Sequence, residues 1–147
     1  MHAADIAEDF PVITIDAEAI VAVRMIAEQT LPGILVVDAS GGPFAVLPAS
    51  QVVRFIVPRY VQDDPVLAGV LSETVADHIA ERLSGKAVGA MLPDHLVDVP
   101  PAQFDDTVLE VAAKMARLRT PLIPVVKQGR LLGVITASRL LAAVLKS

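Results

Sequence analysis

The sequence contains an internal repeat with an offset of 88 residues, and this repeat limits the possible folds more than any other feature. Residues 41–53 and residues 129–141 each give a glycine turn, a short apolar strand and the start of a helix. In both helices apolar residues recur at i, i+1, i+4 and i+5, a spacing that places them on one helical face. Such a repeat indicates two copies of one supersecondary unit. The matching residues are Val52, Val53, Ile56 and Val57 in the first copy, and Leu140, Leu141, Val144 and Leu145 in the second.

Each copy is predicted to run strand, helix, strand, tight turn, strand and helix. The third element of each copy is a continuous apolar run, which is typical of a strand buried on both faces. Gly41-Gly42 and Gln128-Gly129 join two strands directly, which favours a hairpin over the strand–helix alternation of a doubly wound nucleotide-binding fold. The predicted fold class is therefore α/β (α+β), with two pseudo-symmetric β-α-β-β-α repeats. The expected elements are 12–15, 17–29, 34–37, 43–47 and 49–57 in the first copy, and 96–99, 105–118, 122–126, 131–135 and 137–146 in the second.

The stretch between the copies is predicted to be a helical insertion. Its composition is unlike that of a flexible linker, and one helix is expected to run through Leu83 until Gly85 ends it. Short lead-in helices are expected before each copy, and Asp16 and Asp105 are predicted to cap the first long helix of each copy. We therefore expect a first repeat at residues 1–58, the insertion at 59–86 and a second repeat at 87–147.

Composition and charge limit the functional classes. Hydrophobic residues make up 54% of the chain and aromatic residues 3%, so the core is aliphatic, with a surplus that fits either a subunit interface or an Ala/Val-rich genome. There is no cysteine for disulfides or thiol chemistry, and no apolar run approaches the roughly 20 residues of a membrane span, so a cytoplasmic protein is expected. From Glu110 onward the charge is +6, which leaves −11 for the rest of the net −5. These late cations fit either a solvated surface or an anionic ligand.

Three segments of the second copy carry a resemblance to a known family. They are residues 106–111 (Asp-Thr-Val-Leu-Glu-Val), 121–126 (Pro-Leu-Ile-Pro-Val-Val) and 133–138 (Gly-Val-Ile-Thr-Ala-Ser). The pattern resembles the CBS domain family, in which two copies form a Bateman module. The resemblance implies a pseudo-twofold pair of units that meet at a cleft. Many members bind adenosine compounds there, regulate an enzyme, channel or transporter, and pair into dimers.

The resemblance also indicates candidate ligand-binding residues. Binding copies of the family usually read Gly-apolar-x-Thr/Ser-x-x-Asp, whose aspartate accepts hydrogen bonds from the ribose hydroxyls. Here the aspartate position holds Arg139 in the second copy and Gln51 in the first. A charge-assisted hydrogen bond contributes about 1.5–3 kcal/mol, so its loss weakens ribose binding by roughly tenfold or more. The candidate ligand-binding residues are Thr136, Ser138, Arg139, Pro124, Gly133, Ser50 and Gln51. The alternative is that Thr136 is an ordinary helix N-cap and Arg139 an exposed residue of the first turn.

The sequence favours two functions, and a small enzyme that uses the cleft is a remote third hypothesis, because it would require a cofactor or metal for which the sequence has no motif. The first is a stand-alone regulatory sensor, which binds an adenosine-type nucleotide or other anionic metabolite between the repeats and modulates an enzyme or transporter in trans. The second is a ligand-free scaffold of the same fold, acting through dimerisation or protein contact. We expect no catalytic activity, cofactor, metal, nucleic-acid binding or membrane insertion. We expect a homodimer formed through the helix faces that end at Val57 and Leu145.

Overall fold

Each copy of the repeat forms a three-stranded sheet in which the first two strands are parallel and the last two antiparallel. The structure is a computed structural model that describes residues 1–70, 75–93 and 100–146. It confirms the predicted α+β class and the pairing of two similar units. The expected strand at residues 96–99 lies outside the described residues, and the strand that pairs with the centre of the second sheet is β4. The strands are β1 (Val12–Thr14), β2 (Gly33–Val37) and β3 (Pro43–Pro48), then β4 (Ala102–Gln103), β5 (Leu122–Lys127) and β6 (Arg130–Thr136).

The central strands are buried because their apolar runs have neighbours on both faces. All of β2 is buried, as is β5 up to its last residue. A register shift falls at the same place in both sheets, between Val36 and Val37 and between Val125 and Val126. In the second hairpin Gln128 and Gly129 both have positive φ, 52° and 78°, which suits a tight two-residue turn. The predicted hairpins are therefore present.

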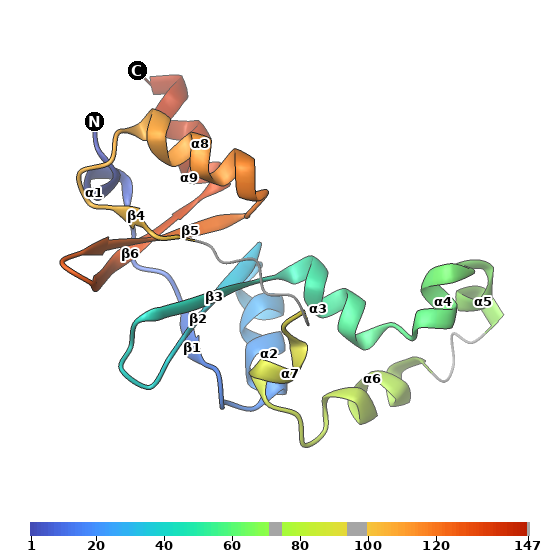
Figure 1. Cartoon of the computed structure of the whole chain (residues 1–147). Helices are drawn as coiled ribbons and strands as arrows, with labels where there is room; N and C mark the ends of the chain where they lie inside the picture. The colour runs from blue at the N-terminus through green and yellow to red at the C-terminus, as the bar shows by residue number, and fades with distance from the viewer. Residues whose placement is uncertain (71–74, 94–99, 147) are drawn as a thin grey trace.

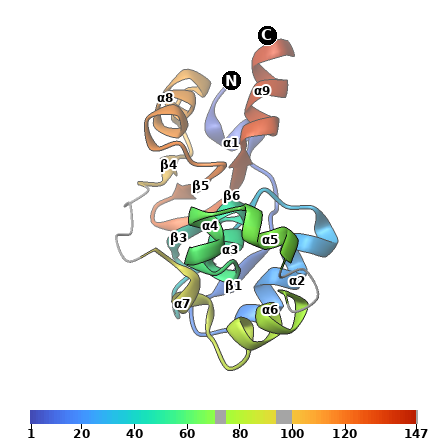
Figure 2. The same ribbon diagram turned by 90° about the vertical axis from the view of Figure 1, so that its right-hand side faces the viewer.

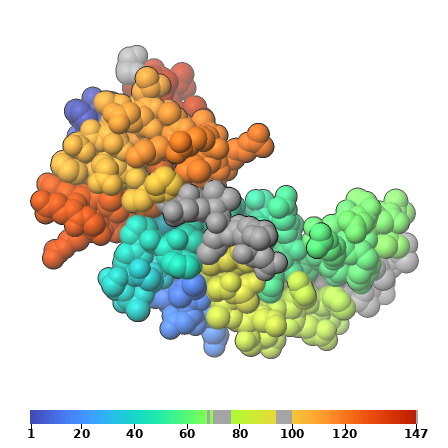
Figure 3. All heavy atoms as spheres, in the orientation of Figure 1, coloured from blue at the N-terminus to red at the C-terminus, as the bar shows by residue number. Residues whose placement is uncertain are grey.

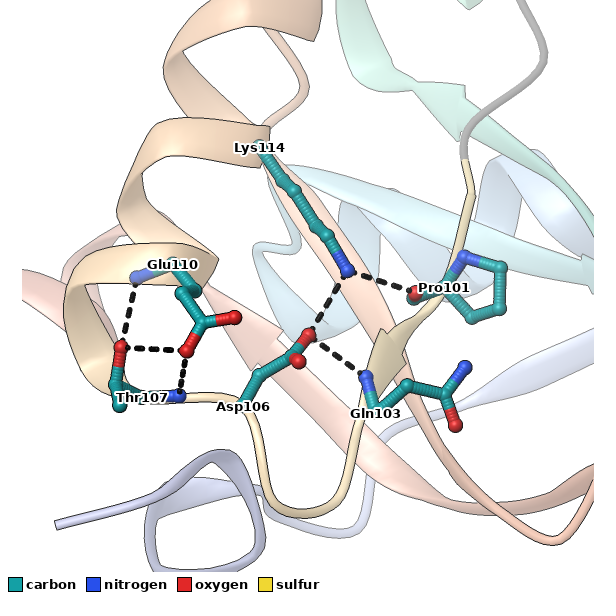
Figure 4. A network of polar contacts seen from close by, with 6 residues as sticks. All are labelled: Pro101, Gln103, Asp106, Thr107, Glu110 and Lys114. Carbon is teal, nitrogen blue, oxygen red and sulfur yellow. Dashed lines mark hydrogen bonds and ion pairs between the residues drawn. The ribbon is translucent and has the colours of Figure 1, made fainter.

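The long helices lie beside the sheets, and their starts differ from the expected ones. They are α2 (Ala19–Gln29), α3 (Ala49–Ile56), α8 (Val108–Leu118) and α9 (Ala137–Lys146). Asp16 and Asp105 are not the caps, because the N-cap positions are held by Glu18 and Thr107. The Thr107 hydroxyl accepts a bond from the Glu110 amide at 3.2 Å, and the Glu110 carboxylate accepts from the Thr107 amide at 3.3 Å (Figure 4). This reciprocal capping box places the N-cap of α8 two residues beyond Asp105, so that the helix begins at Val108.

The two lead-in helices are exchanged between the repeats. Helix α1 (Ala3–Ile6) packs on β4, β6 and α9, whereas α7 (Val88–Met91) packs on α2 and α3. The amides of Ala3 and Ala4 donate to carbonyls of the second repeat at 2.8 and 2.9 Å, and those of Val88 and Gly89 donate to the first repeat at the same distances. Both chain termini consequently lie in the lobe that contains β4–β6 (Figure 1).

The predicted helical insertion forms an arm beside the first lobe (Figures 1 and 2). Its helices are α4 (Arg59–Asp63), α5 (Val66–Val70) and α6 (Val75–Leu83). Leu83 is buried in the core of the first repeat, and Phe55, Ile56 and Ile79 pack partly buried against that core. Gly85 follows with φ +69°, which supports its predicted role at the end of the helix. The first repeat thus has a helical cover that the second lacks among the described residues.

The two sheets meet through a small apolar cluster. Leu35 and Val37 of β2 pack with Leu122 of β5 and Val134 of β6, and Phe10 adds a partly buried ring. Larger apolar clusters lie between each sheet and its helices. Within the described part of the chain, no helix is long and apolar enough to cross a membrane.

Candidate functional site

Three of the candidate residues form one hydrogen-bonded group at the start of α9. The Thr136 hydroxyl oxygen lies 3.2 Å from the Ser138 hydroxyl oxygen and accepts a bond from the Arg139 amide at 3.2 Å. Thr136 is buried, with 6% of its surface exposed. Its hydroxyl therefore caps the first turn of α9, as the structural alternative predicted.

The N-terminal segment covers this edge of the second repeat. Glu8 and Val134 exchange two backbone hydrogen bonds, at 3.0 and 2.9 Å. A Cβ at Gly133 would lie 2.7 Å from the Glu8 carbonyl oxygen, so glycine at this position is needed for the close backbone approach. Gly133 thus has a structural role in holding the exchanged segment.

Arg139 and Gln51 occupy the positions where the resemblance predicts aspartate, and both hold a lead-in helix. The Arg139 Nε donates to the carbonyl of Ile6, the last residue of α1, at 3.2 Å. The Gln51 Nε2 donates to the carbonyl of Met91, the last residue of α7, at 3.1 Å. An ionised aspartate has no hydrogen to donate to either carbonyl. The replacement therefore serves the same structural purpose in both repeats.

Ser50 and Gln51 also line a hollow of about 230 Å³ formed by both repeats. The first repeat contributes the end of β3 and the first turns of α3, and the second contributes residues 118–120 at the end of α8. Its walls combine apolar and polar groups. The apolar residues are Ala45, Val46, Pro48, Pro93 and Leu118, and the polar ones are Ser50, Gln51, Arg54, Arg119 and Thr120.

Pro124 lies elsewhere. It is buried in β5 opposite Val134 and borders a crevice of about 10 Å³ between the sheets, together with Leu35 and Phe44. The seven candidates are thus not one group. The structure brings Ser50 and Gln51 together at the hollow, joins Thr136, Ser138 and Arg139 at the start of α9, and leaves Gly133 and Pro124 in packing positions on β6 and β5.

Sequence reasoning missed Arg54 and Arg119, which give the hollow its charge. Arg54 follows Gln51 by three residues and so shares its face of α3. Arg119 is the left-handed residue that ends α8, with φ 51°, as Thr30 with φ 53° ends α2 in the first repeat. Neither arginine has an ion pair with another described residue, and no carboxylate is among the described residues that line the hollow. The hollow is suited to an anion with an apolar part.

The carboxylates with shifted pKa values lie outside the hollow and have structural partners. The pKa of Asp38 is lowered by hydrogen bonds from the Ser40 hydroxyl, at 2.6 Å, and the Gly42 amide, at 3.0 Å, in the turn between β2 and β3. Burial raises the pKa of Asp106, but hydrogen bonds from Lys114, at 2.8 Å, and from the Gln103 amide, at 2.9 Å, lower it overall (Figure 4). The Asp38 carboxylate thus stabilises the turn between β2 and β3, and the Asp106 carboxylate stabilises the start of α8.

Comparison with known proteins identifies the family. The CBS domain family model matches residues 88–146. A CBS domain-containing protein of unknown function from Kribbella flavida is 54% identical, with 99% of each chain covered and a TM-score of 0.87. CBSX2, a CBS-pair protein from Arabidopsis thaliana, is 15% identical, with 99% of this chain and 94% of that chain covered and a TM-score of 0.76.

The likeness to CBSX2 concerns the fold alone, because identity is low. CBSX2 solved in complex with AMP is 19% identical, covers 99% of this chain and 96% of that chain, and has a TM-score of 0.68. A search of curated proteins found no match. The Kribbella protein matches over almost the entire length of both chains, and the family model matches the second repeat, so this chain belongs to the CBS domain family.

Proposed function

We propose that this chain is a regulatory sensor module that binds an adenosine-type nucleotide or a related anionic metabolite in the hollow between its repeats. The observation that carries the proposal is the hollow itself, in which Arg54 from one repeat and Arg119 from the other face a space without a described carboxylate. AMP is bound by CBSX2, which shares the fold. A ligand that contacts both repeats stabilises one arrangement of the two lobes, and a partner protein can recognise that arrangement.

The lining residues suggest how such a ligand is held. The apolar walls at Val46, Pro48 and Leu118 offer contact area for a flat base, and the arginines offer charged donors for phosphate. Because the Gln51 Nε2 faces the Met91 carbonyl, its Oε1 remains an acceptor for a ribose hydroxyl. A neutral amide is a weaker acceptor than carboxylate, so affinity is expected to be modest.

Titration calorimetry with AMP, ADP, ATP and S-adenosylmethionine tests the proposal, with thermal unfolding as a second readout. Saturation at 1,000 times the dissociation constant adds about 4 kcal/mol to the folded state. Arg119→Ala should weaken binding about tenfold, since it removes one charge-assisted contact from the second repeat. Arg130→Ala is the matched control, because this exposed arginine lies at the far hairpin. Absence of binding by all four compounds would reject the nucleotide proposal.

We also propose that the module pairs through α8 and α9. The side chains of Leu109, Leu141 and Leu145 are 79, 61 and 86% exposed on these adjacent helices. Val57, the other expected contact, is half-buried and borders a hollow beside the insertion. Leu141→Lys should therefore convert a dimer to a monomer in light scattering. Val53→Lys, at the equivalent position of the first repeat, should leave the dimer intact.

The ligand-free scaffold remains the second candidate. It is favoured by the hydrogen bonds that Gln51 and Arg139 donate to the last carbonyls of the lead-in helices, because these side chains then have a structural role at the positions where ribose acceptors are expected. A dimer that forms normally while none of the four compounds binds would favour it. The effector, an enzyme or transporter acting in trans, would then be recognised without a ligand.

A further inference from the structure

The hollow between the repeats opens beside a second, larger one. The second hollow has a volume of about 580 Å³ and shares Gln51, Arg54 and Pro93 with the first. It lies among α3, α7 and the insertion helices α4 and α6. In the space-filling view the green and yellow-green residues of the insertion extend away from the orange second lobe (Figure 3). We refer to this second hollow as the arginine basin.

Three arginines border the basin. Arg54 belongs to α3, whereas Arg59 and Arg82 belong to the insertion. No carboxylate is among the described residues that line it, and none of the three forms an ion pair within the described part of the chain. Since the whole chain carries a net charge of −5, this is a local concentration of positive charge on an acidic protein.

The basin is built around the carboxyl end of α3. Arg82 donates its Nε and Nη2 to the Phe55 carbonyl at 3.0 and 2.9 Å, and its guanidinium lies 4.8 Å from the centre of the Phe55 ring. Gln62 donates to the carbonyls of Arg54 and Val57 at 3.0 and 2.8 Å. These contacts fix the Arg82 guanidinium before any ligand arrives, and its remaining N–H groups have no partner among the described residues. A fixed donor loses little side-chain entropy on binding.

Size favours a ligand that spans both hollows. The inter-repeat hollow alone, at about 230 Å³, is smaller than the roughly 300–1,000 Å³ typical of small-molecule sites. The shared residues make the basin its continuation. A compound with an apolar ring at Val46 and Leu118 would direct a charged tail past Arg54 toward Arg59 and Arg82. Several guanidinium groups placed one after another along the hollow suit linked phosphates, because phosphate oxygens accept paired hydrogen bonds from guanidinium.

We propose that the arginine basin binds two or more linked phosphate groups and so makes the module select nucleoside triphosphates over monophosphates. The selectivity rests on the proposed function, whereas phosphate binding by the basin does not. The same chemistry is offered by a nucleotide tail and by free inorganic polyphosphate. The two sources are distinguished by their dependence on the inter-repeat hollow.

The test is titration calorimetry of the full chain with AMP, ADP, ATP and inorganic tripolyphosphate, without divalent cations. Affinity should rise from AMP to ATP by about tenfold or more, and fall as salt is added. Arg59→Ala should remove most of this gain and leave AMP binding within twofold. Arg59 is exposed at the first position of α4, so the variant is expected to fold, as circular dichroism will check. Arg24→Ala, an exposed arginine of α2, is the control.

The outcomes separate the two proposals. AMP binding with no gain for ATP, and no binding of tripolyphosphate, would overturn the basin and leave the sensor proposal standing. Tripolyphosphate binding that is lost in Arg59→Ala, with no binding of AMP and with ATP bound no more tightly than tripolyphosphate, would support the basin as a polyphosphate site and overturn the nucleotide proposal. Equal ATP affinity in the native chain and Arg59→Ala would also overturn the basin.

Discussion

The two repeats share their framework but differ in what surrounds it. Both have the same strand order and the same bulge, and in both the residue at the expected aspartate position donates to the last carbonyl of a lead-in helix. The first repeat adds the insertion and borders both hollows. The second has the capping box, the ion pair between Lys114 and Asp106, and exposed leucines on α8 and α9.

This difference teaches that the family likeness and the hollow need not lie mainly in the same repeat. The family model matches residues 88–146, yet the site with space for a ligand is built mostly from the first repeat. Among the described residues, the second repeat contributes Pro93 and the end of α8 to it. Its own equivalent edge is covered by the N-terminal segment paired with β6. The copy that the family model matches thus has this edge covered, whereas the copy outside the match lines most of the hollow.

The largest effect on stability is expected from a substitution that breaks the backbone contact between Glu8 and β6. In Gly133→Ala the new Cβ would lie 2.7 Å from the Glu8 carbonyl oxygen, so either β6 or the N-terminal segment must move. We expect the free energy of unfolding to fall by about 1–3 kcal/mol in urea denaturation. The matched change is Ala45→Gly at the equivalent position of β3, which should cost only about 0.5–1 kcal/mol. Equal effects would show that the approach of Glu8 is not what requires glycine.

The next effect separates the structural and binding roles of the expected aspartate position. Gln51→Asp leaves the Met91 carbonyl without its donor, which should lower the free energy of unfolding by about 1–3 kcal/mol. It also restores a carboxylate beside the hollow, so AMP should bind more tightly than to Gln51→Ala, which only loses the donor. Denaturation and calorimetry measure the two changes separately.

The same substitution in the second repeat sharpens the comparison. Arg139→Asp should cost similar stability, because the Ile6 carbonyl loses its donor. It should leave AMP affinity unchanged, since Arg139 is not among the described residues of the hollow. Tighter AMP binding to Arg139→Asp would place the nucleotide at the start of α9 and overturn the assignment to the first repeat.

A smaller effect is expected on the pH dependence of the free energy of unfolding, through Asp106 of the second repeat. The folded pKa of Asp106 lies below its usual value of 3.8, so its contribution to stability is present above that value and is lost as the pH falls through the folded pKa. We expect Asp106→Asn to cost about 1 kcal/mol at pH 7 and much less near pH 2, measured by urea denaturation. When the N-caps Glu18 and Thr107 are aligned, the first repeat has Ala17 at the position of Asp106. An equal loss at both pH values would mean that ionisation of Asp106 contributes nothing.

Much of the fold could be predicted from the sequence because local patterns determine it. The apolar runs around residues 34–37 and 122–126 and the glycine turns suffice for two hairpins. The predicted caps were wrong for different reasons. Thr107 and Glu110 have capping-box spacing, so α8 is capped two residues after Asp105, whereas the N-cap of α2 is Glu18, whose side chain makes no capping bond. The remaining differences depend on contacts between distant parts of the chain.

The candidate site was less predictable for that reason. Ser50 and Gln51 do line a hollow, but the arginines that give it charge come from opposite repeats, and no periodicity indicates which helix ends meet. The exchange of α1 and α7 was likewise invisible, so the donor role of Gln51 and Arg139 could not be recognised. Whether any of the seven candidates binds a ligand stays a prediction.

The smallest effect on stability is expected from a variant that transfers the capping box of α8 to the start of α2. Glu18 and Val21 occupy the positions that correspond to Thr107 and Glu110, and the Glu18 side chain makes no capping bond. The double variant Glu18→Thr/Val21→Glu would give α2 the reciprocal bonds that begin α8, and Val21 is already 44% exposed. We expect a gain of about 0.5–1 kcal/mol in the free energy of unfolding. Thr107→Ala should lose a similar amount; a neutral double variant beside a costly Thr107→Ala would mean that the start of α2 is fixed by its backbone bond to Lys86 rather than by capping.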